Sequence, residues 1–313
     1  MPLHHSTPLI QSTAMQSELG VPVWLKLESA QPCASFKLRG MGLAAERAVA
    51  DGAAQLISSS GGNAGYAVAW AGKSLGVPVT VVVPTTTGPR MRRLIEATGA
   101  QVHICGDAWD EAHAAATQLA EESKGSLLHP FDHPDIWEGN STLIDEVQQA
   151  GLVPNRVVVA VGGGGLLCGV LEGMRNAGWA HVPVLAVETT GAASFAAALD
   201  AGTPVTLPEI TSLARTLGAK RVCSRALAMT HVHPVQSAVV TDGAAVRACS
   251  RFLDDHRVLV EPSCGAALST VYDRHPHLTV ASGPVLVIVC GGAAVTRSQL
   301  EQWLRDHGPS QPG

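Results

Sequence analysis

Short apolar runs alternate with longer alanine-rich stretches along most of the 313-residue chain. The runs are rich in valine, and most of them end at a glycine, proline or serine. The stretches that follow carry apolar residues three or four positions apart, the spacing of one helix face. The runs span residues 55–60, 77–84, 100–106, 156–161, 182–188 and 285–290. Each run and the stretch behind it predict a strand followed by a helix.

Most of these runs are continuously apolar rather than alternating, which is typical of strands buried on both faces. The pattern therefore predicts an α/β protein with parallel-rich sheets flanked by helices. A chain of this length exceeds the size at which one core stops growing, about 250–300 residues. Turn-like segments at 31–35 and 129–134 suggest where the chain divides. We expect a large domain of residues 1–30 and 134–313 and a small domain of residues 31–133.

Composition narrows the possible partners. The chain is 46% hydrophobic and 15% charged, with a net charge of −5 and no basic stripe, which argues against nucleic acid as the main partner. The first residues lack the pattern of a signal peptide, and no apolar run is long enough to span a bilayer. The seven cysteines are scattered and never spaced C-x-x-C. We expect a soluble cytoplasmic protein with reduced thiols and no membrane partner.

Three glycine-containing segments follow predicted strands, at 58–65, 161–167 and 290–294. Ligands of parallel α/β proteins bind at this edge of the sheet, where a helix N-terminus favours an anion. Four successive glycines at 162–165 expose backbone N–H groups, so a phosphate-bearing ligand is expected. A dinucleotide site is the alternative, with Glu188 as its ribose-binding acid. The spacing G-x-G-x-x-G is not met, because Leu167 or Cys168 holds the sixth position.

Lys37 differs from the other four lysines of the chain. It lies between Phe36 and Leu38 at the start of a predicted helix, where the helix dipole disfavours a cation. An apolar, glycine-rich neighbourhood beside a phosphate loop suits a lysine that binds a cofactor covalently. A surface lysine at a helix start remains the alternative on spacing alone.

Five motifs carry a family resemblance, in this order: ASFKLRG (34–40), SSGGNAG (59–65), AVGGGGLLCGV (160–170), EPSCGAAL (261–268) and VIVCGG (287–292). The chain resembles the L-serine dehydratase/L-threonine deaminase family of pyridoxal-phosphate enzymes, especially the animal-type serine dehydratases and serine dehydratase-like proteins. The resemblance implies the two-domain tryptophan-synthase-β-like fold (fold type II) and a homodimer. It implies elimination of water and ammonia from L-serine to give pyruvate, and from L-threonine to give 2-oxobutyrate. A β-replacement synthase of the same fold and a weakly active cofactor-binding protein are the alternatives.

The resemblance also assigns roles to residues around the cofactor, pyridoxal 5′-phosphate. Lys37 would bind it covalently, Phe36 would pack near its ring and Asn63 would bind the ring oxygen. Its phosphate would lie against Gly162, Gly163, Gly164, Gly165 and Leu166, and Cys290 would face its ring nitrogen. Taken singly, Asn63 is equally explained as a helix cap and Cys290 as a core thiol.

Two further sites are implied by the resemblance. The substrate carboxylate would bind at Ser60, Gly61, Asn63 and Ala64. A monovalent cation such as K⁺ would bind at Glu188, Ala192, Ser194, Leu217 and Ala219, although an exposed glutamate at a strand end explains Glu188 as well. Gly61 departs from the alanine usual in active animal serine dehydratases, and we expect it to leave a space beside the substrate loop. The pairs His4–His5 and His231–His233 lack further metal ligands and are expected at the surface.

Overall fold

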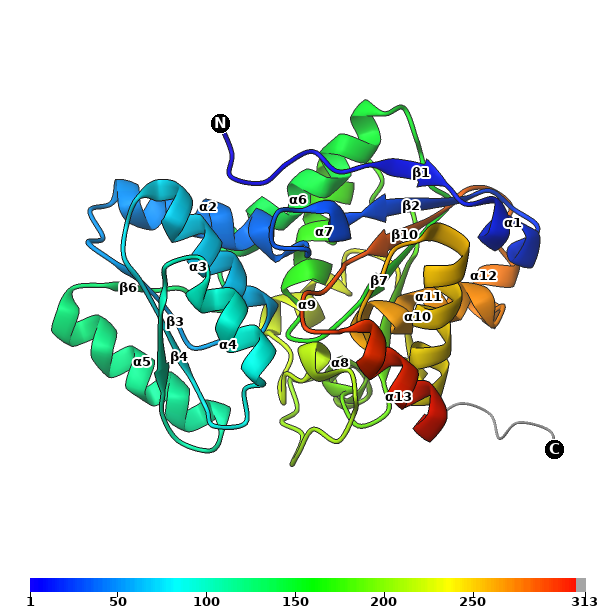
Figure 1. Ribbon diagram of the computed structural model, residues 1–313. Helices are drawn as coiled ribbons and strands as arrows, with labels where there is room; N and C mark the ends of the chain where they lie inside the picture. Colours follow the sequence, from blue (N-terminus) through cyan, green and yellow to red (C-terminus); the bar gives the residue numbers. More distant parts are fainter. Residues whose placement is uncertain (308–313) are drawn as a thin grey trace.

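Two open β-sheets, each flanked by helices, make up the computed structural model, which describes residues 1–307 (Figure 1). The six-stranded sheet has the order β1-β2-β10-β7-β8-β9 and the four-stranded sheet the order β5-β4-β3-β6. All neighbouring strands are parallel except β1 and β2. The predicted α/β architecture is confirmed.

Strands with continuous apolar runs lie at the centres of the sheets. The strands are β1 (Leu9–Gln11), β2 (Val23–Leu27), β3 (Leu56–Ser58), β4 (Val79–Val83), β5 (Gln101–Ile104), β6 (Ser126–Leu127), β7 (Arg156–Ala160), β8 (Val184–Thr189), β9 (Val235–Val240) and β10 (Val285–Val289). Every residue of β4, β7, β8 and β10 is buried. The sequence did not predict β1, β6 and β9, which are short or only partly buried edge strands.

Helices cover both sheets. They are α1 (Thr13–Leu19), α2 (Lys37–Ala50), α3 (Asn63–Leu75), α4 (Pro89–Glu96), α5 (Trp109–Ser123), α6 (Pro134–Gln149), α7 (Gly165–Asn176), α8 (Ser194–Ala201), α9 (Ser224–Met229), α10 (Asp242–His256), α11 (Pro262–Tyr272), α12 (Pro276–Thr279) and α13 (Arg297–His307), with short 3₁₀ turns η1 (Glu28–Ala30) and η2 (Arg215–Leu217). Within residues 1–307, no helix combines the length and apolarity that crossing a bilayer requires.

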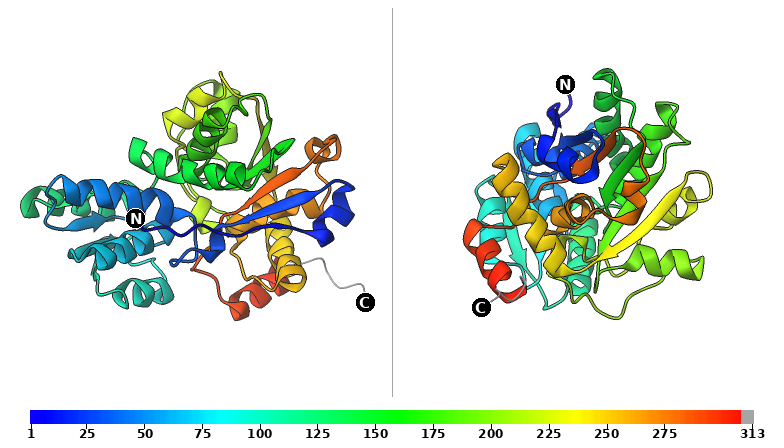
Figure 2. Two further views of the ribbon diagram at one scale, coloured as in Figure 1. Left: turned by 90° about the horizontal axis from the view of Figure 1, so that it is seen from above. Right: turned by 90° about the vertical axis from the view of Figure 1, so that its right-hand side faces the viewer.

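The two sheets form two lobes that lie side by side (Figures 1 and 2). Strands of the four-stranded sheet come only from residues 56–127, and those of the six-stranded sheet come from 9–27 and 156–289. This is the order expected if a small domain is inserted into a large one. The boundaries at 30/31 and 133/134 stay a prediction, because α2 packs against α3 of one lobe and α6 of the other.

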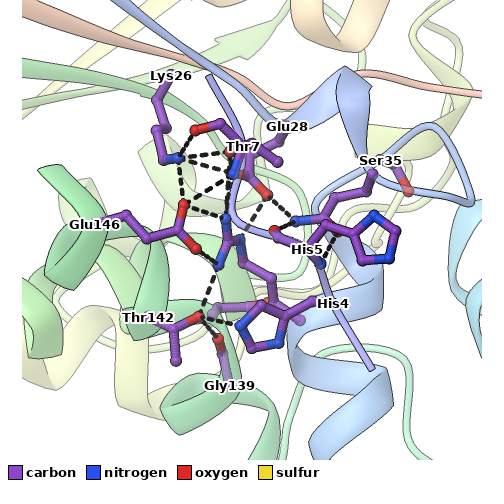
Figure 3. Close-up of polar contacts among 12 residues, drawn as sticks. His4, His5, Thr7, Lys26, Glu28, Ser35, Gly139, Thr142 and Glu146 are labelled. Atoms are coloured by element: carbon purple, nitrogen blue, oxygen red, sulfur yellow. Dashed lines mark hydrogen bonds and ion pairs between the residues drawn. The ribbon is translucent and has the colours of Figure 1, made fainter. Parts of the chain in front are cut away.

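A buried network of four charged side chains joins these elements (Figure 3). Lys26 of β2, Glu28 of η1 and Arg39 of α2 are fully buried, and Glu146 of α6 is 16% exposed. Arg39 Nε lies 2.6 Å from Glu28 Oε2, and Arg39 Nη1 lies 2.7 Å from Glu146 Oε1. Lys26 pairs with Glu146, and Thr7 donates a hydrogen bond to Glu28. Two cations and two anions therefore balance each other in this network.

The network holds the Glu146 carboxylate ionised. Burial by itself would raise the pKa of Glu146, but the hydrogen bonds and charges of Arg39 and Lys26 lower it to about 2. Because Arg39 lies two residues after Lys37, this network also fixes the first turn of α2.

Replacing Arg39 tests how much the network contributes. Arg39→Met leaves Glu28 and Glu146 without their shared cation, so we expect a loss of about 3–5 kcal/mol of unfolding free energy. The matched control is Arg47→Met, on the same helix, because Arg47 is 42% exposed and pairs with Asp135 and Glu138 at the surface. That change should cost about 0–1 kcal/mol. Urea unfolding of both variants gives the comparison, and equal losses would contradict the assignment.

Candidate active site

One cavity lies at the carboxyl ends of β7 and β10 and at the starts of α2, α3 and α7. This edge is where ligands of parallel α/β proteins bind. The cavity is lined by these residues of the sequence prediction: Phe36, Lys37, Asn63, Gly162, Gly163, Gly164, Gly165, Leu166, Leu217 and Cys290. Phe131, Thr216, Glu261 and Ser263 line it as well and were not predicted.

Lys37 presents its amine to this cavity from the first residue of α2. Its Nζ donates a hydrogen bond to the carbonyl oxygen of Pro130 at 2.6 Å and lies 5.3 Å from the centre of the Phe36 ring. Within residues 1–307, no carboxylate forms an ion pair with it. Burial lowers the pKa of Lys37 to about 8. A substantial fraction of this amine is neutral near physiological pH, as a nucleophile or base requires.

Backbone contacts pin the segment before Lys37 to the end of β10. The N–H of Phe36 donates to the carbonyl of Cys290 at 3.1 Å, and Ser35 forms an isolated bridge with Gly291. A Cβ on Gly291 would lie 2.3 Å from the carbonyl oxygen of Ala34, so this approach requires glycine. These contacts hold Lys37 and Cys290 beside the same cavity.

The four glycines at 162–165 connect β7 to α7. The N–H groups of Gly162, Gly163 and Gly164 donate no hydrogen bond to any described residue. Gly164 adopts a φ of +93°, and α7 begins directly after it, so free N–H groups and the positive end of a helix dipole coincide. The Phe131 ring packs so closely that a Cβ on Gly163 would lie 2.3 Å from it. This loop fits a phosphate group.

Asn63 has a fixed side-chain orientation. Its Oδ1 accepts from the N–H of Ala293 at 3.0 Å, and its Nδ2 donates to Glu261 Oε1 at 2.8 Å. The cap of α3 is Gly62, with no side-chain cap hydrogen bond, so the helix-cap explanation of Asn63 is wrong. One N–H of the amide remains available at the cavity.

Glu261 is the main residue that the sequence analysis missed, although it opens the motif EPSCGAAL. Its side chain is buried, and its Oε1 accepts from Asn63 and Thr216. Its Oε2 has no hydrogen-bond partner in the described part of the chain. Burial raises the pKa of Glu261 to about 7 against the effect of its hydrogen bonds.

Cys290 is both a buried thiol and part of the cavity wall. A hydrogen bond with Cys264, followed by burial, raises the pKa of Cys290 well above its ordinary value. The sulfur is therefore a neutral thiol at the end of β10 rather than a thiolate.

Of the four residues predicted to bind the substrate carboxylate, only Asn63 lines the cavity. Ser60, Gly61 and Ala64 are not part of its lining. The expectation of an open space at Gly61 is wrong. A Cβ on Gly61 would lie 2.4 Å from Thr87 Oγ1 and 2.6 Å from Thr87 Cγ2. The Thr87 side chain fills the volume that an alanine methyl would take.

The residues expected to bind a cation are brought only partly together. Glu188 is fully buried, so the exposed strand-end explanation is wrong. Its two oxygens accept from the N–H groups of Phe195 and Ala196 at 2.8 Å each, at the start of α8. Burial raises the pKa of Glu188 to about 7.

The remaining members of the cation set are buried or close to each other. Ala192 and Ser194 are buried, and Ser194 Oγ lacks a hydrogen-bond partner among residues 1–307. The N–H of Ala219 donates to the carbonyl of Leu217 at 2.7 Å. No group of three or more His, Cys, Asp or Glu side chains in the described chain could hold a metal ion.

Of the four histidines expected at the surface, His5 and His231 are exposed, whereas His4 and His233 are not. His233 is buried and its Nε2 lies 2.8 Å from the carbonyl oxygen of Val182, so its placement at the surface was wrong. His4 is half-buried beside Thr142, next to the charged network.

Comparison with known proteins agrees with this site. Residues 1–291 match the sequence model of a family described as pyridoxal-phosphate dependent enzyme. A rat protein named serine dehydratase-like is 48% identical over 309 residues, covering 96% of this chain and 94% of that protein. Human L-serine dehydratase/L-threonine deaminase is 44% identical over 308 residues, with the same coverage. A fungal L-serine ammonia-lyase from Rhizomucor miehei has a TM-score of 0.93 at 34% identity, covering 98% of this chain and all of that one.

The fold and the amine-bearing cavity are thus those of a pyridoxal-phosphate-dependent enzyme of fold type II, as predicted. Within that class, the chain belongs to the family of the serine dehydratases and serine dehydratase-like proteins. Maize serine racemase shares the fold, with a TM-score of 0.87 at 25% identity over 97% of this chain and 93% of that one.

The contact between Gly61 and Thr87 can be tested by a pair of substitutions. Gly61→Ala alone forces Thr87 to move, and overpacking of this kind costs about 1–3 kcal/mol. In Gly61→Ala/Thr87→Ala the crowding Oγ1 and Cγ2 are gone, so most of the stability should return. Thermal unfolding of the single variants and the double variant measures the coupling. Strictly additive effects would show that the two side chains do not compete for one space.

Proposed function

We propose that the protein removes water and ammonia from L-serine to give pyruvate, and from L-threonine to give 2-oxobutyrate. The observation that carries this proposal is the partly buried amine of Lys37, free of any carboxylate partner, in one cavity with a free glycine loop and a thiol. Relatives named serine dehydratase-like, L-serine dehydratase/L-threonine deaminase and L-serine ammonia-lyase support the choice of substrate.

The residues of the cavity fit pyridoxal phosphate. Lys37 would bind it covalently, with the Phe36 ring nearby, and Asn63 would donate its free N–H to the ring oxygen. The N–H groups of Gly162–Gly165 and Leu166 would receive its phosphate. When bound, the cofactor supplies an electron-withdrawing ring that stabilises negative charge at the substrate Cα.

The chain's own groups would carry the proton transfers. The Lys37 amine would be the base that removes the proton from the substrate Cα. The pKa of about 8 suits this role, because a general base works best near the operating pH. Cys290 would face the ring nitrogen with a thiol, a weak hydrogen-bond donor that leaves this nitrogen unprotonated. That environment favours elimination over transamination.

The substrate carboxylate would bind at the start of α3. Ser60, Gly61, Asn63 and Ala64 surround this helix N-terminus, where backbone N–H groups and the helix dipole favour an anion. Thr87 packs against the same loop and would limit how far the substrate moves.

We also propose a homodimer in the cytoplasm. The structure has seven free cysteines, and six of them are buried. Such thiols suit a reducing compartment. The homodimer is the family expectation, which light scattering of the purified protein checks.

Covalent attachment of the cofactor should occur at Lys37. Borohydride reduction followed by peptide mapping should place the cofactor on this lysine, and Lys37→Ala should abolish attachment. Lys73→Ala is the matched control, because Lys73 lies in the last turn of α3, away from the cavity. Attachment to another lysine in the unmodified protein would refute the assignment.

Product analysis separates the candidate reactions. Incubation with L-serine and no added thiol should release pyruvate and ammonia in equal amounts. Almost no D-serine should form, because racemisation needs a second acid to protonate the opposite face of Cα and Gly61 has no side chain to supply it. A β-replacement synthase would need an added thiol. Tight cofactor binding without turnover would indicate a weakly active cofactor-binding protein. Chiral chromatography and keto-acid assays distinguish these outcomes.

A monovalent cation is proposed beside Glu188, with carbonyls of Ala192, Ser194, Leu217 and Ala219. A cation there would offset the burial of the Glu188 carboxylate and brace β8 against η2, whose Leu217 lines the cavity. Activity and cofactor affinity should both be higher in K⁺ than in a bulky organic cation at equal ionic strength. Identical values in the two buffers would remove the cation from the account.

A further inference from the structure

The Glu261 carboxylate forms the centre of a hydrogen-bonded group in the cavity wall. Its Oε1 accepts from Asn63 Nδ2 at 2.8 Å and from the hydroxyl of Thr216. Thr216 Oγ1 lies 2.5 Å from Ser263 Oγ. Thr216 has one proton and gives it to Glu261, so Ser263 must donate to Thr216. Asn63 and Thr216 therefore both donate to Glu261, the acceptor of the group, and Ser263 donates to Thr216.

This arrangement determines which way the Asn63 amide points. Oδ1 faces the N–H of Ala293, and Nδ2 faces Glu261. The reversed amide would set two acceptors against each other at Glu261 and two donors against each other at Ala293. Both clashes leave buried polar groups unsatisfied, each at a cost of about 1–3 kcal/mol.

The absence of a side chain at Gly292 leaves room for the Glu261 carboxylate. A Cβ on Gly292 would lie 2.1 Å from Glu261 Oε2, and Gly292 adopts a φ of +139° that other residues rarely reach. Burial of a carboxylate costs free energy unless its oxygens are paired, and Oε2 has no hydrogen-bond partner among residues 1–307.

We propose that Glu261 is a positioning residue, whose Oε1 fixes the Asn63 amide so that its second Nδ2–H is donated into the cavity. The inference rests on the proposed role of Asn63 in binding the cofactor's ring oxygen. Glu261 acts through Asn63 and needs no contact with the substrate. This role depends on the acceptor oxygen of Glu261 and not on its charge. A neutral side chain with an oxygen in the same place should therefore preserve the orientation of the Asn63 amide.

Three single variants and one double variant test the proposal, with pyridoxal phosphate affinity by equilibrium dialysis and the absorption spectrum of the bound cofactor as readouts. Glu261→Gln keeps an acceptor and should stay within about threefold of the unmodified affinity with an unchanged spectrum. Glu261→Leu removes the acceptor at similar size and should weaken binding about tenfold, the effect of one lost hydrogen bond. In the Asn63→Ala background, Glu261→Leu should have almost no further effect, because the residue it orients is gone.

Two results would overturn the proposal. If Glu261→Gln binds as weakly as Glu261→Leu, then the charge or proton of Glu261 matters rather than its acceptor oxygen. If Glu261→Leu weakens binding equally with and without Asn63, then it does not act through Asn63. Should Glu261→Leu fail to fold, Glu261→Ala takes its place in the same cycle. No substrate is present, so a failure of the protein to turn over serine would not affect these outcomes.

Discussion

The buried ion pairs of Arg39 fix the position of Lys37, two residues earlier in α2. Arg39 is held by Glu28 from η1 and by Glu146 from α6, with no exposed surface of its own. Separating either carboxylate from Arg39 would leave a buried charge unpaired, which is costly. The junction of α2, β2 and α6 is therefore rigid. The start of α2 is consequently fixed against the large sheet before any ligand binds.

Two cations of one helix turn have opposite environments. Lys37 and Arg39 are two residues apart, so their side chains leave α2 about 200° apart and face different sides. Arg39 faces the carboxylates, whereas Lys37 faces a cavity where its hydrogen-bond partner is the Pro130 carbonyl. The paired charge provides stability, and the unpaired amine is available for chemistry.

Local patterns identified the parts of the fold and site that depend on neighbouring residues. Continuous valine-rich runs predicted the buried strands, and the glycines at 162–165 predicted a loop with free backbone N–H groups at a helix start. The network around Arg39 could not be predicted, because Lys26 and Glu146 are 120 positions apart and carry no local signal of contact. The same holds for Thr87 beside Gly61 and for Thr216 beside Glu261, since only the packing of separate loops brings them together.

The central claim is that Lys37 is a partly buried amine kept free of any carboxylate partner. The most direct measurement is the rate at which pyridoxal phosphate becomes attached to the cofactor-free protein as a function of pH, divided by the rate for a free lysine derivative. Because burial lowers the pKa of Lys37 to about 8, the relative rate should be high and constant below about pH 8 and should fall between pH 8 and pH 10.5, where only the free lysine is still losing its proton. A relative rate that does not change with pH, as for an amine with the ordinary pKa of 10.5, would contradict the account.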